Sequence, residues 1–227
     1  MKEVGTLDFM GKIDLNVRKQ ELVNDSSLYL IIKRLIDILG ALIGIILASP
    51  IMLIVAICIK IEDPNGPVFF SQVRNGVYPS TFKMYKFRSM YKDAEERLEE
   101  IQHLNEQTGP AFKIKDDPRI TKVGRFIRKT SLDELPQLFN VLKGDMSLVG
   151  PRPAIPREVE KYTPYQKQRL FVKPGLTCIW QVSGRNNIEF DEWVELDIKY
   201  IKERNLWLDL KLILMTIPAL LGDENAS

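Results

Sequence analysis

Hydrophobic residues in this chain are concentrated in one uninterrupted stretch near the N-terminus. Residues 38–59, ILGALIGIILASPIMLIVAICI, contain no charged side chain. As a helix they would extend about 33 Å, which matches the hydrocarbon core of a bilayer. A buried core helix of this length would normally keep a polar face, and a secretory signal peptide would not follow such a long polar segment. The pattern therefore predicts a helix in contact with membrane.

A proline in the middle of the stretch indicates how this helix meets the membrane. Pro50 removes a backbone hydrogen bond and bends a helix, and Ser49 is placed to bond a backbone group that the bend frees. Positive residues favour the cytoplasmic side, and a hairpin bent at Pro50 keeps both flanks there, whereas a straight span does not. We therefore expect a re-entrant membrane helix over residues 31–61. The flanking positive residues before the stretch are Lys33 and Arg34, with Arg18 and Lys19 further out, and those after it are Lys60, Arg74, Lys83, Lys86 and Arg88.

Downstream of this stretch, short periodic segments alternate with polar turns. Residues 68–73 and 81–87 flank Asn75-Gly76 and predict a β-hairpin. Residues 120–128 predict a basic amphipathic helix, which suits either a headgroup surface or an ordinary protein surface. The proline-rich segment 150–156 is expected to be extended or turned. Further helices are expected at 91–107, 131–142, 158–171, 189–204 and 206–221; the last lies on the membrane surface or in the core.

These elements define an α+β fold class that is mostly helical. We expect an N-terminal extension over residues 1–30, the re-entrant membrane helix hairpin over 31–61, and one cytosolic domain over 62–221. The cytosolic domain should contain the small β-hairpin and amphipathic helices at the membrane surface. No internal repeat or low-complexity tract divides it further.

Composition restricts the chemistry that this domain can perform. The whole chain has 32 Lys and Arg against 30 Asp and Glu and a net charge of only +2, so no nucleic-acid partner is expected. Cys58 and Cys178 lack zinc-site or disulfide-framework spacing and fit a reducing compartment. His103, the single histidine, lies in a charged segment, which argues against Ser-His-Asp, Cys-His and His-Glu-x-x-His chemistry. Carboxylates, lysines and arginines remain, with or without a metal.

The strongest candidate for chemistry is the carboxylate pair Asp133–Glu134. Ser131 and Glu134 also fit a helix capping box, and acidic residues are common where helices begin. Arginines suited to phosphate occur elsewhere in the chain. A divalent metal would turn such a set from a salt-bridge network into a phosphoryl-transfer site with a carboxylate nucleophile. These further candidates are Arg88 after the hairpin, Arg152 between two prolines, and Arg185 with Asn186 in a small-residue loop.

Nine motifs, in order, resemble the bacterial sugar transferases, the monotopic phosphoglycosyltransferases that start lipid-linked glycan assembly. Cys178 replaces the glycine that usually follows the Lys-Pro-Gly-Leu-Thr motif, a change that touches no charged group. The motifs are Lys33-Arg34-x-x-Asp37, Ser49-Pro50, Pro67-Val-Phe-Phe, Lys86-Phe-Arg-Ser-Met90, Asp117-Pro-Arg-Ile-Thr121, Thr130-Ser-Leu-Asp-Glu-Leu-Pro-Gln137, Gly144-Asp-Met-Ser-Leu-Val-Gly-Pro-Arg-Pro153, Lys173-Pro-Gly-Leu-Thr177 and Trp180-Gln-Val-Ser-Gly-Arg-Asn186.

The resemblance implies a specific reaction. Such enzymes move a sugar-1-phosphate from a nucleotide-diphosphate sugar to undecaprenyl phosphate and release UMP, with Mg²⁺ as cofactor. By this analogy Asp133 is the nucleophile, Glu134 is a metal ligand or a base, and both carboxylates are candidate Mg²⁺ ligands. Arg88 and Arg152 would bind phosphate. Arg185 and Asn186 would contact the nucleotide or the sugar.

The resemblance also implies a location and partners. The family's membrane helix is re-entrant with its break at Ser-Pro, here Ser49–Pro50, which places the protein in the bacterial inner membrane with the catalytic domain facing the cytoplasm. Expected partners are a UDP-sugar donor, with glucose or galactose as the sugar, undecaprenyl phosphate and membrane lipids; a homodimer is left open. Longer family members carry further spanning helices, which we do not expect here. The alternative is a non-catalytic membrane-tethered adaptor for polysaccharide enzymes, which loss of Asp133 or Glu134 would have favoured.

Overall fold

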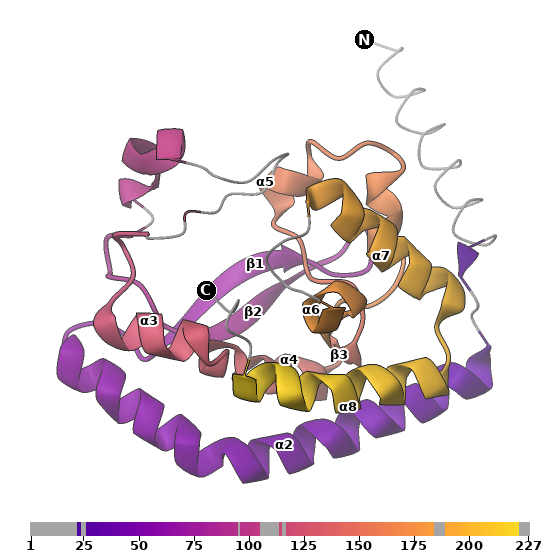
Figure 1. The fold of residues 1–227 in the computed structure, drawn as a ribbon, viewed down its shortest axis with the longest axis horizontal. Coiled ribbons are helices and arrows are strands. Elements are labelled where there is room, and N and C mark those ends of the chain that lie inside the picture. The colour runs from indigo at the N-terminus through magenta and orange to yellow at the C-terminus, as the bar shows by residue number, and fades with distance from the viewer. Residues whose placement is uncertain are drawn as a thin grey trace.

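The computed structural model describes residues 22–23, 26–94, 96–104, 114, 117–183 and 189–222. One long helix, α2 (Ser27–Glu62), runs beneath a domain of shorter elements (Figure 1). In chain order these are β1 (Phe69–Asn75), β2 (Thr81–Phe87), the 3-10 helix η1 (Glu96–Leu104), α3 (Lys122–Lys129), the 3-10 turn η2 (Leu132–Glu134), α4 (Gln137–Lys143), β3 (Ser147–Val149), α5 (Pro156–Val159), the 3-10 helix η3 (Gln166–Leu170), β4 (Gly175–Thr177), α6 (Ile179–Ser183), α7 (Phe190–Glu203) and α8 (Leu206–Gly222).

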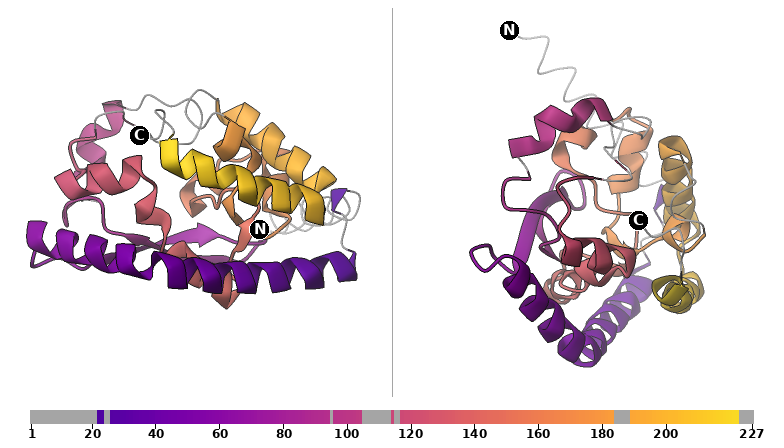
Figure 2. Two further views of the ribbon diagram at one scale, coloured as in Figure 1. Left: turned by 60° about the horizontal axis from the view of Figure 1, so that its bottom comes forward. Right: turned by 60° about the vertical axis from the view of Figure 1, so that its left-hand side comes forward.

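Helix α2 is continuous over 36 residues and bends near its middle, as Figure 2 shows. Pro50 has no N–H to donate to the carbonyl of Ile46, one turn earlier. The Ser49 hydroxyl takes over that role and donates to the Ile46 carbonyl at 2.8 Å. The structure therefore confirms that Ser49 satisfies a backbone group at the proline, and the two arms remain joined without a loop.

Both arms of α2 pack against the same domain. In the first arm, the buried Asp37 carboxylate accepts hydrogen bonds from the Ser147 hydroxyl at 2.9 Å and the Leu148 N–H at 2.8 Å. In the second arm, Val55 and Ile59 are buried in a cluster with Phe87 and Ile127. At the end of α2, Glu62 accepts the N–H groups of Lys122 and Val123 and so caps α3. The long helix is thus fixed to the domain on both sides of its bend.

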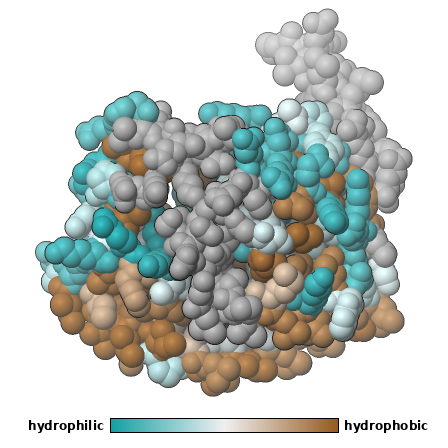
Figure 3. All heavy atoms as spheres, viewed as in Figure 1, coloured by the Kyte–Doolittle hydropathy of each residue, from teal (hydrophilic) through white to brown (hydrophobic). Residues whose placement is uncertain are grey.

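The remaining surface of α2 is apolar and exposed. In the space-filling view, hydrophobic residues form a band along the edge of the molecule where α2 lies (Figure 3). Within the described part of the chain, α2 is the single helix long and apolar enough to cross a membrane. The large exposed side chains of this band include Leu39, Leu42, Ile43, Ile46, Leu47, Leu53, Ile54 and Ile57.

Two small sheets lie above α2. Strands β1 and β2 pair antiparallel, with Phe69 opposite Phe87, which confirms the predicted hairpin. The parallel pair β3–β4 was not expected from the sequence, since three-residue strands show no readable alternation. Here the backbones approach so closely that a Cβ on Gly175 would lie 2.0 Å from the Gly150 nitrogen, so glycine is required.

Several helix predictions need correction, while those for 189–204 and 206–221 are confirmed by α7 and α8. The segment 131–142 is not one helix: residues 132–134 form the 3-10 turn η2, and α4 begins only after Pro136, which has no N–H for a helical hydrogen bond. Ser131, which precedes η2, adopts a left-handed conformation with φ of 55°. The Ser131 side chain makes no capping hydrogen bond, so the capping-box prediction is wrong. The segment 158–171 contains only the end of α5 and the 3-10 helix η3, and 91–107 contains the 3-10 helix η1.

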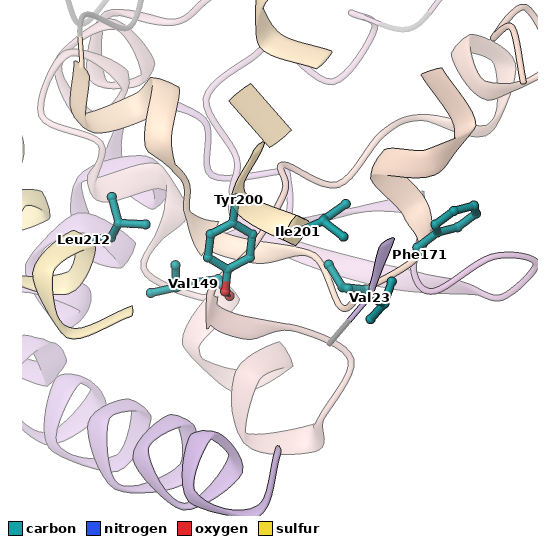
Figure 4. Close-up of a cluster of buried hydrophobic side chains, with 7 residues drawn as sticks. Val23, Val149, Phe171, Tyr200, Ile201 and Leu212 are labelled. Atoms are coloured by element: carbon teal, nitrogen blue, oxygen red, sulfur yellow. The ribbon is translucent and has the colours of Figure 1, made fainter. Parts of the chain in front are cut away.

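A cluster around Tyr200 joins β3 to the C-terminal helices (Figure 4). The Tyr200 ring is buried with Val149 of β3 and Leu212 of α8. Its hydroxyl donates to one carboxylate oxygen of the buried Asp209 at 2.7 Å. The other oxygen of Asp209 accepts a hydrogen bond from the Lys33 ammonium at 2.9 Å. This network fixes the N-terminal arm of α2 to α8.

Candidate active site

The carboxylate pair lies between β2 and the helical segment that follows α3. Asp133 and Glu134 sit in the 3-10 turn η2, directly after the left-handed Ser131. Lys86, near the end of β2, places its ammonium 2.7 Å from a Glu134 oxygen and 3.3 Å from an Asp133 oxygen. One lysine thus bridges both carboxylates. From the sequence, Lys86 was expected only as a positive residue flanking the membrane segment and as part of a motif; no role at the carboxylates was predicted for it.

The buried environment of Asp133 shifts the pKa of its carboxyl group. Only 6% of its surface is exposed, and this burial raises the pKa of the Asp133 carboxyl above its usual value. The positive charge of Lys86 opposes the shift, the neighbouring Glu134 carboxylate adds to it, and the Arg128 guanidinium opposes it. Asp133 is therefore a desolvated carboxylate whose anionic form depends on adjacent cations.

Arg152 is the predicted phosphate-binding arginine that the structure brings to the pair. Its guanidinium lies 3.5 Å from a Glu134 oxygen and 5.9 Å from the centre of the Trp180 ring, so the Pro-Arg-Pro segment directs it toward η2. Its side chain remains 36% exposed and accessible to a ligand. A surface hollow opens here, lined by Arg74, Met84, Glu134, Gln137, Arg152 and Pro153, among others.

The other predicted residues occupy different positions. Arg88 forms a buried ion pair with Asp63 at 2.6 Å and also donates to the Asp63 backbone carbonyl, so it secures the end of α2. No contact between Arg88 and the carboxylate pair is seen in the described part of the chain. Arg185 and Asn186 lie outside the described residues. Their expected roles, and a phosphate role for Arg88, stay predictions.

Asp197 is fully buried on α7 and pairs with the buried guanidinium of Arg169. Burial raises the pKa of the Asp197 carboxyl to about 6, although the Arg169 charge acts in the opposite direction. Its other oxygen has no hydrogen-bond partner among the described residues. On an acidic helical face such as this one, a solvated, an ion-paired or an active-site role could be expected for Asp197; the structure shows a buried ion pair.

The donor set at the site suits a hard divalent cation that also binds substrate. Magnesium in phosphoryl-transfer sites commonly takes one or two carboxylates and completes its shell with water and substrate phosphates. Asp133 and Glu134 supply that number of carboxylates, with oxygens close together on one lysine. Over the described ranges, no group of three or more His, Cys, Asp or Glu side chains forms a complete metal cage. The carboxylate pair therefore fits a cation held jointly with a phosphate-bearing ligand.

One carboxylate of the pair, Glu134, lines a hollow together with two arginines, on a domain packed along one long helix whose outer face is apolar and exposed. This arrangement suits an enzyme that works in contact with a membrane. The family model described as bacterial sugar transferase matches residues 28–223. The chain belongs to this family.

Several curated proteins are similar to the chain. The galactosyl transferase CpsE of Streptococcus agalactiae is 54% identical over 196 residues, which cover 85% of this chain and 43% of that protein. The undecaprenyl-phosphate galactose phosphotransferase of Salmonella typhimurium is 45% identical over 213 residues, covering 92% and 44%. The exopolysaccharide production protein ExoY of Rhizobium meliloti is 41% identical, covering 82% and 84%. The chain thus spans less than half the length of the first two relatives.

Proposed function

We propose that this protein transfers a hexose-1-phosphate from a UDP-sugar to undecaprenyl phosphate and releases UMP, as the first membrane step of exopolysaccharide, capsule or O-antigen synthesis. The observation that carries the proposal is the buried Asp133 beside Glu134, bridged by Lys86 and faced by Arg152. The names of relatives supply the substrate class, since one is an undecaprenyl-phosphate galactose phosphotransferase. Another relative is named for N-acetylgalactosamine, so galactose is only the favoured sugar.

The proposed chemistry has two steps at one phosphorus atom. A carboxylate oxygen of Asp133 attacks the sugar-linked phosphorus, and the bond to the UMP oxygen breaks as UMP leaves. A phosphate oxygen of undecaprenyl phosphate then attacks the same phosphorus and releases the Asp133 carboxylate. Lys86 and Arg152 are placed to offset the repulsion between an anionic nucleophile and an anionic diphosphate. A covalent intermediate lets one site serve a soluble donor and a lipid acceptor in turn.

Mg²⁺ is the cofactor we propose, held by Asp133 and Glu134 together with the donor diphosphate. When bound, it would neutralise phosphate charge during transfer. With the cation bound, the Glu134 carboxylate would contact both the cation and the Lys86 ammonium, and the Arg152 guanidinium could bind phosphate. We expect chelation of divalent cations to abolish UMP release.

The membrane geometry that we propose is a re-entrant helix in the bacterial inner membrane, with the domain on the cytoplasmic side. Its support is that Asp37 in one arm of α2 and Ile59 in the other both pack on the same domain. A straight span would separate its two ends by the thickness of the hydrocarbon core, so one domain could not contact both. The exposed apolar side chains of the bend would then face lipid.

Replacing Pro50 by alanine is expected to straighten α2 and move an N-terminal tag to the outer side of the membrane. Alanine restores the missing N–H and favours a regular helix. Protease accessibility of the tag in spheroplasts would measure this. Ser49→Ala is the matched control, because it removes the hydroxyl bond to Ile46 but keeps the proline, and its tag should stay inside. A tag that stays cytoplasmic in Pro50→Ala would argue against the proposed role of the bend.

Replacing Lys86 by methionine is expected to lower the rate of UMP release by about 100-fold. It should also shift the acid limb of the pH profile upward. Lys86 holds the Asp133 pKa down, so without it the pKa rises and the reactive anion persists only at higher pH. Rates measured across pH would show both effects. Lys129→Met removes an exposed lysine and should keep the wild-type profile; an unshifted acid limb in Lys86→Met would contradict the role of Lys86.

The decisive test of the whole proposal is UMP release by the purified full chain with Mg²⁺ and a panel of UDP-sugars, with and without undecaprenyl phosphate. Turnover that depends on the lipid and on one donor sugar would support the proposal. If no nucleotide donor gives turnover, a non-catalytic membrane adaptor becomes the better explanation.

A further inference from the structure

Arg74, near the end of β1, is a second guanidinium in the hollow beside the carboxylate pair. Its two terminal nitrogens donate to the Pro153 carbonyl at 3.1 Å and to the Gln72 side-chain oxygen at 2.6 Å, both of them neutral acceptors. Its Nε is buried and has no hydrogen-bond partner among the described residues. Arg74 therefore brings a positive charge into the site without an ion-pair partner in the described part of the chain.

Within the described part of the chain, the carboxylates of Glu134 and Glu158 act on Arg74 from a distance, and neither forms an ion pair with it. Glu134 is the carboxylate that lines the hollow, and it already contacts both Lys86 and Arg152. Burial and the neighbouring Arg152 charge lower the pKa of Arg74 to about 10, while the Glu158 and Glu134 carboxylates act in the opposite direction. A desolvated cation next to a like charge is unfavourable unless an anion joins it. The guanidiniums of Arg74 and Arg152, with Glu134 as the carboxylate that lines the hollow, suit an anionic ligand that carries two negative charges.

The backbone explains why both arginines face the same space. Arg74 binds the carbonyl of Pro153, the residue that follows Arg152, so the Pro-Arg-Pro segment and the end of β1 form one wall of the hollow. Guanidinium groups match phosphate oxygens bidentately, and two adjacent ones can hold two linked phosphates. Arg88, the residue that the sequence had suggested for this task, is instead paired with Asp63.

We infer that Arg74, together with Arg152, binds the diphosphate of the nucleotide-sugar donor. This inference rests on the proposed function and adds a donor-binding residue to it. The group recognised by the two arginines is the diphosphate of the donor, which carries two negative charges. The lipid acceptor is a monophosphate and has no diphosphate before the transfer. Loss of Arg74 should therefore weaken donor binding more than acceptor binding.

The test is titration of the full chain with UDP in the presence of Mg²⁺, together with separate KM values for donor and acceptor. We expect Arg74→Gln to weaken UDP binding and raise the donor KM by about 10- to 100-fold, the range for a charge-assisted hydrogen bond, while the acceptor KM stays unchanged. Arg74→Lys keeps the positive charge but loses the two-pronged guanidinium, so its UDP affinity and donor KM should lie between those of the wild type and Arg74→Gln. Arg157→Gln, which removes an exposed arginine on α5, is the matched control with wild-type values.

Two results would overturn the inference. One is UDP affinity in Arg74→Gln that equals the wild type. The other is an equal loss for donor and acceptor with a lowered thermal midpoint in both Arg74 variants, which would mean that Arg74 only holds the Pro153 backbone. The UDP titration measures donor binding, and the lipid-dependent assay measures turnover, so the two can fail independently. A wild-type chain that binds UDP through Arg74 without turnover would reject the proposed reaction, but not the binding site.

Discussion

Asp133→Asn is expected to reduce UMP release by at least about a thousandfold, because an amide cannot form the proposed phosphosugar intermediate. The variant should fold and bind membrane normally, since asparagine has nearly the same shape and Lys86 keeps its 2.7 Å contact with Glu134. The rate of UMP release with donor, Mg²⁺ and undecaprenyl phosphate measures the effect.

A matched control for this prediction is Asp93→Asn. Asp93 lies on the surface, where it faces Arg97 at 3.8 Å, so losing its charge should leave turnover at the wild-type level. Flotation with lipid vesicles would confirm that both variants still associate with membrane. Full turnover by Asp133→Asn would reject Asp133 as the nucleophile, whatever the behaviour of the control.

Arg169→Met is expected to destabilise the fold by about 3–5 kcal/mol, since it leaves the buried Asp197 carboxylate without its cation. The double variant Arg169→Met with Asp197→Leu should recover much of this loss, because it removes both charges together. Thermal midpoints of the detergent-purified chain would compare the two. Equal midpoints for the single variant and wild type would contradict the assigned burial of this pair.

The surface provides the control for this second prediction. Arg97→Met breaks the exposed pair with Asp93, and exposed pairs one helical turn apart contribute less than about 0.5 kcal/mol. Its midpoint should therefore match that of the wild type. A comparable loss in Arg97→Met would mean that the method responds to charge removal in general rather than to the buried pair.

Local patterns in the sequence were sufficient to predict the features that depend on neighbouring residues. The uncharged stretch, the proline and the serine beside it predicted a helix bent at Pro50 and a hydrogen bond from Ser49 to a freed backbone group, which the structure identifies as the Ile46 carbonyl. Alternation around Asn75-Gly76 predicted the hairpin, and the two prolines predicted a restricted backbone at Arg152. In each case the residues that carry the signal are close together in the sequence.

Features that depend on distant pairing could not be predicted in this way. Lys86 meets Glu134 across 48 positions, and Arg88 meets Asp63 across the whole hairpin, so spacing alone gives no indication of either partner. The predicted helix over 131–142 is wrong because Ser131, at its start, is left-handed and Pro136 separates η2 from α4. The carboxylate pair lies in the short turn between these two residues, in contact with Lys86 of β2.

The attachment of α2 at both ends has a consequence for how the proposed lipid acceptor would reach the protein. Asp37 and Asp209 fix the first arm, and Glu62 caps α3, the helix that leads to the carboxylate pair. The distance from the apolar bend to Asp133 is therefore set by packing and not by a flexible tether. In a bilayer the Asp133 carboxylate would lie at a constant distance from the hydrocarbon core. The phosphate headgroup of the proposed lipid acceptor would therefore have to extend out of the core by that distance to react.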